Sequence, residues 1–406
     1  MVDPDMEVRP ETIFAGFGDV TELEPVITHE VTDYGWRGLT GDGEVLEVKS
    51  ANGHKVDVPN EITVTFRGNA IGVRPVLKPP KPIDIGEYLE HFNAAVDAYK
   101  VGELSAALLY SDAAIALAPT LRARFNRSMI LLAMGRWREG LDEYEKLEQH
   151  APFIRPQVKE ALAAGLAPWR GEDLMGKRIL VIHAHGFGDT IQCLRYIPHL
   201  HTMGAKISVH VPNELARLAM PFGDSFELSK CDYFIPFLHL LTRLQVEPDA
   251  PPDPPYLSVH LNLVDNWRAR LGLATRKRIG IAWSVGKPSN GDYPREISFD
   301  ELWARLDHDA DLYSVQTQRP DDSWVRGVKC FDFEDFADCA ALMLCMDEII
   351  TVDTAAVHLA GAIGHPNVKL LLSKWASWRW VKNWYPNVKI CRQTSDGDWA
   401  SALAQC

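Results

Sequence analysis

The spacing of hydrophobic and polar residues divides the chain into three kinds of segment. Over residues 1–80, short β-type runs such as "EITVTF" and "IGVRPVL" alternate with turn-forming stretches such as "TGDGE", which predicts a small β-rich domain of hairpins. The stretch "KPPKP" at 78–82 is stiff and poor in backbone donors, so it is interpreted as a linker. From Ile85 onward the spacing becomes helical.

The helical segment repeats itself with an offset of 33 residues, which aligns Phe92 with Phe125, Gly102 with Gly135 and Pro119 with Pro152. With a glycine at the turn between helices and a proline closing each unit, it resembles two tetratricopeptide repeats, whose consensus is slightly longer. The stretch "IRPQVKEALAAGLAPW" is expected to supply a capping helix, which gives a repeat domain over 83–165. An unrelated pair of helical hairpins is the alternative.

Strands and helices alternate in the remainder of the chain. One series contains "RILVIHA", "TIQCLRYIPHLHTMG" and "KISVHV", and a second runs from "KRIGIAWS" to "NVKLLL", after the proline-rich "VEPDAPPDPPYLS". Apolar strands joined by helices are typical of parallel sheets. The predicted fold class is therefore α/β, with two doubly wound αβα (Rossmann-like) domains at 172–274 and 277–406 that face each other across a cleft.

Charge and cysteine content indicate which partners and which cellular compartment to expect. The formal net charge is −13, and residues 1–80 hold 14 acidic against 7 basic side chains, which disfavours binding to a phosphate backbone. The seven cysteines are odd in number and show no CxxC spacing, so we expect reduced thiols. The acidic N-terminus has no apolar leader and no stretch reaches 18 uninterrupted apolar residues, so the expectation is a cytoplasmic protein without a membrane span.

Two turns between strand and helix carry the candidate chemistry. In "AHGFGDTIQ", Gly186 and Gly188 allow close backbone approach, and Asp189 is either the N-cap of a helix starting at Thr190 or a catalytic carboxylate. In "EIITVDTAAVHLAGAIGHP", the strand ends at 353–354 and the N–H groups of 354–356 can hold a phosphate. A plain capped turn, with a buried histidine at 358, is the alternative.

Several common sites are absent from the sequence. "GFGDTI" lacks the third glycine of the dinucleotide motif, and neither GxSxG nor a P-loop occurs. The acidic pairs in "DAD" (309–311) and "DGD" (396–398) are interpreted as solvated turns, so no metal is expected. The tryptophans at 375, 378, 380 and 384 can stack on a ligand or pack the domain, and both interpretations stay open.

Taken together, "GFGDTIQCLRYIPHL", "RIGIAWSVGKPSNGDYPREIS", "DFADCAALMLCMDEIITVDTAAVHLAGAIGHP" and "WASWRWVKNWYPNVKICRQTSDGDW" resemble the glycosyltransferase module of bacterial tetratricopeptide-repeat proteins. That module is similar to glycosyltransferase family 9, the heptosyltransferases, and more remotely to O-linked N-acetylglucosamine transferases. The resemblance covers roughly residues 88–406. It implies a GT-B pair of domains, an acceptor on the first and a nucleotide sugar on the second, with no tightly bound cofactor and no metal.

The resemblance also implies roles for individual residues. Asp189 matches the general base that takes a proton from the acceptor hydroxyl. The donor side, which holds the diphosphate and ribose of the nucleotide sugar, comprises Lys287, Arg295, Asp353, Thr354, Ala355, Ala356 and His358. The acceptor side comprises His185, Gly186, Gly188 and Gln192.

The chain also departs from this family. Heptosyltransferases usually have a glycine where this chain has Ala355, so an ADP-heptose donor does not follow from the resemblance. His185 stands where a glutamine is expected, and it and His183 either line the acceptor pocket or end the strand in solvent. Residues 1–80 have no counterpart in the family.

The expected function is a glycosyltransferase that moves a sugar from a nucleotide diphosphate donor to a hydroxyl, with the helical repeats holding a protein or another large acceptor. A non-catalytic repeat scaffold with a degenerate transferase module is the rival hypothesis. A nucleic-acid glycosyltransferase fits the same fold, but the acidic charge disfavours it.

Overall fold

A computed structural model describes backbone and side chains for residues 84–150, 154–224, 227–246, 254–285, 295–316, 327–374 and 377–406. Five strands between residues 26 and 73 are described by their backbone alone. The structure divides into two compact units, one ending at Ile154 and the other starting at Arg155. The four domain boundaries given above stay predictions. Residues 155–163, expected as a capping helix of the repeats, belong to the second unit.

The first unit begins with antiparallel strands. β1 (Val26–Thr32), β2 (Gly35–Thr40) and β3 (Val45–Lys49) form one sheet in that order, and β4 (Ile62–Phe66) pairs with β5 (Asn69–Val73). These strands lie in the segment predicted to be β-rich. The predicted linker at 78–82 lies outside the described residues, and the β-rich domain as a whole stays a prediction.

Four helices follow: α1 (Ile85–Lys100), α2 (Leu104–Leu117), α3 (Leu121–Ala133) and α4 (Trp137–Leu147). Gly102 and Gly135 occupy the α1–α2 and α3–α4 turns with φ of 81° and 76°, a left-handed conformation that favours glycine. Two helical hairpins with equivalent turns are what the offset of 33 residues predicts. Their membership of the tetratricopeptide family stays a prediction.

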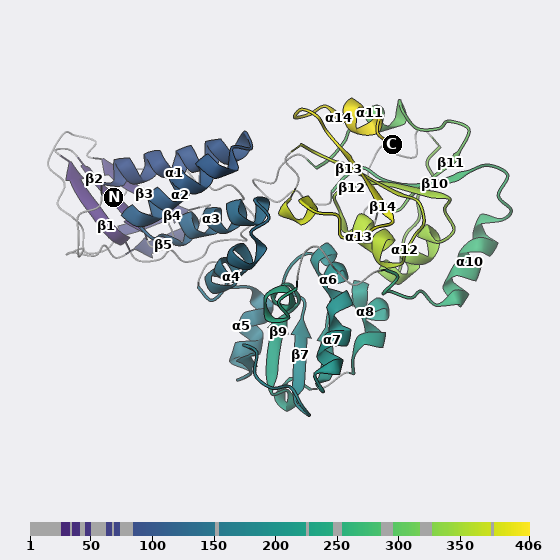
Figure 1. Ribbon diagram of the computed structural model, residues 1–406, viewed down its shortest axis with the longest axis horizontal. Helices are drawn as coiled ribbons and strands as arrows, with labels where there is room; N and C mark the ends of the chain where they lie inside the picture. Colours follow the sequence, from purple (N-terminus) through teal and green to yellow (C-terminus); the bar gives the residue numbers. More distant parts are fainter. Residues whose placement is uncertain are drawn as a thin grey trace. The chain divides into compact units, whose positions relative to one another are not determined.

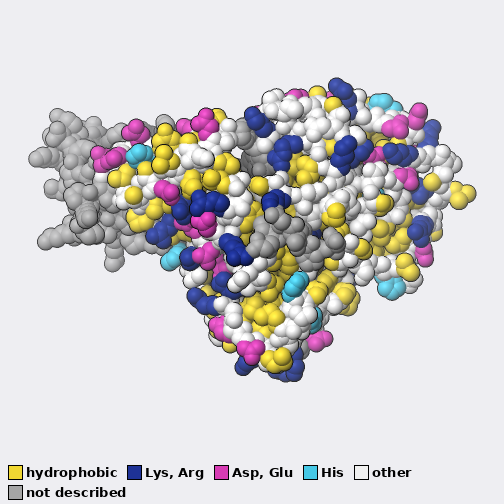
Figure 2. Space-filling view, in the orientation of Figure 1, with side chains coloured by type: hydrophobic (Ala, Val, Ile, Leu, Met, Phe, Trp, Pro, Cys, Tyr) yellow, Lys and Arg dark blue, Asp and Glu magenta, His cyan; other side chains and the backbone are white. Residues whose placement is uncertain are grey.

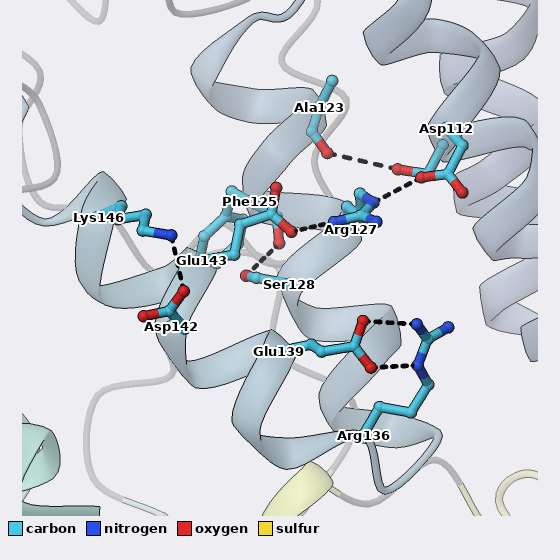
Figure 3. Close-up of polar contacts among 11 residues, drawn as sticks. Asp112, Ala123, Phe125, Arg127, Ser128, Arg136, Glu139, Asp142, Glu143 and Lys146 are labelled. Atoms are coloured by element: carbon cyan, nitrogen blue, oxygen red, sulfur yellow. Dashed lines mark hydrogen bonds and ion pairs between the residues drawn. The ribbon is translucent and has the colours of Figure 1, made fainter. Parts of the chain in front are cut away.

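Polar contacts join three of these helices (Figure 3). Arg127 of α3 donates to Asp112 of α2 at 2.5 Å and to Glu143 of α4 at 2.7 Å, so one guanidinium links both hairpins. By contrast, the pairs Arg136–Glu139 and Lys146–Asp142 are short-range and exposed. Pairs of that kind add little to stability.

The second unit holds two parallel sheets, each with its own helices (Figure 1). The first lobe, residues 155–246, begins with α5 (Pro156–Ala163) and has the strand order β6 (Ala167–Pro168), β9 (Tyr233–Pro236), β7 (Arg178–Ile182), β8 (Lys206–His210). Its other helices are α6 (Phe187–Cys193), α7 (Ile197–Thr202), α8 (Asn213–Ala219) and α9 (Leu240–Arg243). A 3-10 turn, η1 (Leu194–Tyr196), joins α6 to α7.

The second lobe, residues 261–406, has the strand order β11 (Asp311–Ser314), β10 (Arg278–Ala282), β12 (Glu348–Val352), β13 (Val368–Leu372), β14 (Val388–Arg392), all parallel. Its helices are α10 (Leu261–Leu271), α11 (Phe299–Trp303), α12 (Phe336–Met343), α13 (Ala355–Ala362) and α14 (Trp399–Leu403). Every residue of β10 and β12 is buried, as expected for central strands covered on both faces.

The predicted α/β class with two parallel sheets is confirmed, and one local boundary is corrected. The helix after β7 begins at Phe187, not at Thr190, because Gly186 with φ −69° and ψ 161° takes the N-cap position. None of the seven cysteines forms a disulfide. Among the described residues, no helix has the length and apolar character needed to cross a lipid bilayer.

Candidate functional site

A pocket of about 210 Å³ lies at the carboxyl edge of the second sheet. Ligands of doubly wound sheets commonly bind at this edge. The pocket is lined by residues at the ends of β10 and β11, by α12 and α13 and, from the first lobe, by α6. Its lining consists of Phe187, Ala282, Ser284, Val315, Gln316, Phe336, Cys339, Thr354, Ala355, Ala356 and Leu359.

The turn after β12 forms one wall of this pocket. Thr354 is the N-cap of α13, and its hydroxyl accepts a hydrogen bond from the Ala356 N–H at 3.3 Å. The N–H groups in the first turn of a helix have no partner within the helix and favour an anion. Thr354, Ala355 and Ala356 all line the pocket, and the Ala356 N–H is already used by the Thr354 hydroxyl. Their role toward a phosphate stays a prediction.

The other donor-side residues are placed differently. Asp353 is 6% exposed and accepts a hydrogen bond from the Trp380 indole at 2.7 Å, so its carboxylate is used within the protein. Arg295 donates to the backbone carbonyl of Asp353 at 3.4 Å, which places its guanidinium beside this turn. Lys287 lies outside the described residues.

Gln316 is a pocket residue that the sequence did not single out. Its side-chain oxygen accepts from the N–H groups of Trp283 and Ser284 at 2.6 and 2.8 Å, which ties the end of β11 to the end of β10. Only the amide oxygen can accept hydrogen bonds, so these two N–H groups fix the orientation of the Gln316 amide. Its nitrogen points away from them. That nitrogen is buried without a hydrogen-bond partner among the described residues. A ligand acceptor in the pocket would satisfy it.

Asp189 is held from both lobes. As the third residue of α6, it accepts a hydrogen bond from the Gly186 N–H at 3.2 Å, the reach-back half of a capping box. Its other carboxylate oxygen pairs with Arg379 Nε of the second lobe at 2.5 Å. Burial alone would raise the pKa of Asp189, but the charges of Arg379 and His185 outweigh it and lower that pKa. Asp189 is therefore ionised at neutral pH.

Arg379, which sequence analysis missed, comes from the tryptophan-rich segment. Its guanidinium lies 4.6 Å from the Trp378 ring centre and also donates to the Ser377 hydroxyl at 3.2 Å. Trp378, Trp380 and Trp384 are each at most 5% exposed, which favours packing over ligand stacking for these three. Trp375 lies outside the described residues.

His358 of α13 lies at the contact between the two lobes, where α6 and α13 run side by side (Figure 1). A Cβ built on Gly188 would approach its ring to 2.8 Å, so only glycine permits this contact. The ring stacks on Trp380 at 5.2 Å, and Nδ1 lies 3.0 Å from the Tyr385 hydroxyl. Burial lowers the pKa of His358 to about 4, so the imidazole is neutral.

The proposed acceptor-side residues do not form one surface. Gln192 is 2% exposed, within the core of the first lobe. His183 lies beyond the end of β7 and bonds through Nδ1 to the Thr190 hydroxyl at 2.8 Å, while the His185 ring lies 6.3 Å from that of His239. Gly186 and Gly188 serve as helix cap and packing contact, as described above. The role of these residues toward an acceptor stays a prediction.

A second ion pair links the lobes at the start of α12, next to the pocket residue Phe336. Arg217 of α8 binds the carboxylate of Asp335, which also caps α12 by accepting from the Asp338 N–H at 2.9 Å. The described residues contain no group of three His, Cys, Asp or Glu side chains arranged to hold a metal ion.

Comparison with known proteins gives distant relatives. No family model matches the chain. The protein FlbA of Caulobacter vibrioides is 26% identical over 365 residues, which cover 78% of this chain and 60% of FlbA. This chain thus spans about three-fifths of the length of that curated relative.

Three similar solved structures are glycosyltransferases. ADP-heptose lipopolysaccharide heptosyltransferase II of Escherichia coli is 13% identical, with a TM-score of 0.39 over 56% of this chain and 97% of that one. A family 9 glycosyltransferase of Veillonella parvula is 11% identical, with a TM-score of 0.41 over 55% of this chain and 88% of that one. A mutant O-GlcNAc transferase of Thermobaculum terrenum is 12% identical, with a TM-score of 0.29 over 78% of this chain and 82% of that one. All three TM-scores lie below 0.5.

Proposed function

We propose that the chain is a glycosyltransferase that uses a nucleotide diphosphate sugar and a hydroxyl acceptor. The observation that carries the proposal is the pocket at the carboxyl edge of the second sheet, bounded by the N-terminus of α13 and by α6, the helix that holds the ionised Asp189. A helix N-terminus suits a diphosphate, and a carboxylate from the opposite lobe suits an incoming hydroxyl. The sequence resemblance to glycosyltransferase family 9 supports the same assignment.

In the proposed reaction, Asp189 accepts the proton of the acceptor hydroxyl as its oxygen bonds to the anomeric carbon. The bond from that carbon to the diphosphate oxygen breaks, and the diphosphate leaves with the electron pair. The first turn of α13, Arg295 beside it and the amide nitrogen of Gln316 stabilise the departing group. The protein or other large acceptor is proposed to bind the helical hairpins of the first unit.

One observation favours the rival hypothesis of a non-catalytic scaffold. The Asp189 carboxylate is already occupied by Arg379 and by the Gly186 N–H, and a carboxylate with a lowered pKa is a weak base. Under the transferase proposal, Arg379 moves from Asp189 toward the diphosphate when the donor binds. The nucleic-acid alternative has less support, because the net charge is −13 and acidic and basic side chains are mixed over the face seen in Figure 2.

Thermal-shift screening against nucleoside diphosphates and nucleotide sugars tests the proposal. A ligand at a hundredfold excess over Kd stabilises the native state by about 2.7 kcal/mol, which raises Tm by several degrees. The matched variant is Ala355→Asp, which adds a negative charge at the first residue of α13. We expect at least a tenfold loss of nucleotide affinity with no loss of stability, because an acidic residue suits that helix position. Unchanged affinity in Ala355→Asp would locate the nucleotide elsewhere, and no shift with any ligand would refute donor binding.

A further inference from the structure

A buried cation lies between the two lobes. Arg195, in η1 of the first lobe, is 1% exposed, and none of the described aspartates or glutamates forms an ion pair with it. Instead, its guanidinium donates to the Trp384 carbonyl at 3.0 Å and to the Tyr256 hydroxyl at 3.1 Å. It also lies 4.5 Å from the Tyr256 ring centre and 4.7 Å from that of Tyr385. A buried charge without an opposite charge is costly to keep.

The chemistry of the partners fixes the direction of the first hydrogen bonds around Arg195. Arginine only donates, so the Tyr256 oxygen accepts from it, and the Tyr256 hydroxyl hydrogen goes to the Ile191 carbonyl, which only accepts, at 3.1 Å. Toward Tyr385, at 3.4 Å, the Tyr256 oxygen can then only accept. The single hydroxyl hydrogen of Tyr385 can go to Tyr256 or to His358 Nδ1.

The same constraint reaches His358. Both Tyr385 contacts are hydrogen bonds only when Tyr385 donates to Tyr256 and its oxygen accepts from a protonated His358 Nδ1 at 3.0 Å. We propose that the Ile191 carbonyl, by taking the Tyr256 hydrogen, directs the Tyr385 hydrogen to Tyr256 and so holds His358 as the neutral Nδ1–H tautomer, with an unprotonated Nε2 that accepts hydrogen bonds. The contact with Gly188 places this Nε2 beside the turn that carries Asp189, since a Cβ at Gly188 would lie 3.4 Å from it.

This tautomer decides what kind of ligand group His358 can bind. An unprotonated nitrogen repels a phosphate oxygen and accepts from a hydroxyl. His358 is 3% exposed and does not line the pocket, so a ligand that reaches it would have to offer a hydroxyl and not the diphosphate. This differs from the role that the family resemblance implies for His358. The ligand assignment rests on the proposed function, whereas the tautomer does not.

Histidine NMR tests the tautomer without any activity measurement. In protein labelled with ¹⁵N at histidine, long-range proton–nitrogen correlations distinguish a protonated from an unprotonated ring nitrogen, and His358→Gln assigns the signal. We expect an unprotonated Nε2 at pH 7 in the wild type. Tyr385→Phe removes the acceptor for Nδ1–H, so its His358 signal should shift toward the other tautomer.

Tyr196→Phe is the matched control. Tyr196 is a buried neighbour of Arg195 whose hydroxyl has no hydrogen-bond partner among the described residues, so its loss should leave the His358 signal in place. An Nε2–H signal in the wild type, or the same tautomer in folded wild type and Tyr385→Phe, would overturn the proposal.

A second spectrum, with saturating amounts of the nucleoside diphosphate that raises Tm most, tests the ligand assignment. Nε2 should stay unprotonated, and a change to Nε2–H would show that the imidazole donates to phosphate and would overturn the assignment. If no nucleotide binds, the proposed function fails and the ligand assignment fails with it, whereas the tautomer stands on the first spectrum.

Discussion

The substitution Asp189→Asn separates a structural carboxylate from a catalytic one. Asparagine keeps an oxygen that can accept from the Gly186 N–H, so the capping contact survives. The negative charge opposite Arg379 is lost, however, and the Arg379 side chain is only 23% exposed. The substitution therefore leaves a partly buried guanidinium without its carboxylate.

The expected cost in folding free energy lies between two limits. Removing one partner of a fully buried ion pair costs about 3–5 kcal/mol, and an exposed pair contributes at most about 1 kcal/mol. The side chains of Asp189 and Arg379 are 12% and 23% exposed, and Arg379 keeps its contacts with Ser377 and Trp378. We expect a loss of roughly 1–3 kcal/mol, whichever role Asp189 has. Stability alone therefore cannot decide between the roles.

Turnover decides between them. If Asp189 is the general base, Asp189→Asn should lower turnover by about 10²–10⁴-fold while the affinity for the donor stays nearly constant. The matched variant Arg379→Gln removes the same ion pair from the other side and leaves the carboxylate. It should destabilise the fold similarly. It should also lower turnover, because it removes the cation proposed to stabilise the diphosphate, but by less than Asp189→Asn, because the carboxylate base remains.

The assay combines sugar transfer, a urea melt and a donor titration on both single variants and the double variant. Near-normal turnover in Asp189→Asn would refute the base assignment. Equal losses in the two single variants, with no further loss in the double variant, would show that Asp189 acts only by holding Arg379.

Two further predictions follow from buried groups. Burial lowers the pKa of His358 to about 4, against about 6.5 in the unfolded chain. As the pH drops, the unfolded state therefore binds the proton first, and the folded state loses stability between pH 6.5 and 4. The full loss is roughly 3 kcal/mol. His183 and His365 also have lowered pKa values, so urea melts between pH 7.5 and 4.5 should show a shallower slope in His358→Gln than in the wild type, and an unchanged slope would contradict the prediction. Gln316→Glu keeps an oxygen for the Trp283 and Ser284 N–H groups but replaces the unpartnered nitrogen, so calorimetry should find nucleotide affinity about tenfold lower, and equal affinity would remove Gln316 from the site.

The sequence was sufficient for features set by local patterns. The apolar run of β12 followed by Thr354 predicted a buried strand and a capped helix, and both are present. The start of α6 was misplaced because aspartate is favoured both at the N-cap and in the first turn, and only the Gly186 backbone separates the two cases. The Arg379–Asp189 pair spans 190 positions, a separation that carries no local signal.

Arg195 and Gln316 show why other parts of the site escaped prediction. Arg195 lies in a stretch with helical spacing, where an arginine is usually solvated, and its burial depends on rings from the second lobe and from the connector at 254–260. Gln316 follows β11, and its side-chain oxygen is directed by N–H groups 32 and 33 positions away. A single glutamine after a strand has no spacing that indicates this role.

Gly188 and Gly361 leave the space that the rings of His358 and Tyr385 occupy. Gly188 lies against His358, and a Cβ built on Gly361 of α13 would come within 2.5 Å of the Tyr385 ring. In a library randomised at 361 and 385, alanine at 361 should survive mainly where residue 385 has become smaller than tyrosine. Every such survivor also lacks the tyrosine hydroxyl that contacts His358 Nδ1. Mutational paths that relieve crowding here therefore pass through variants whose imidazole is free to change tautomer.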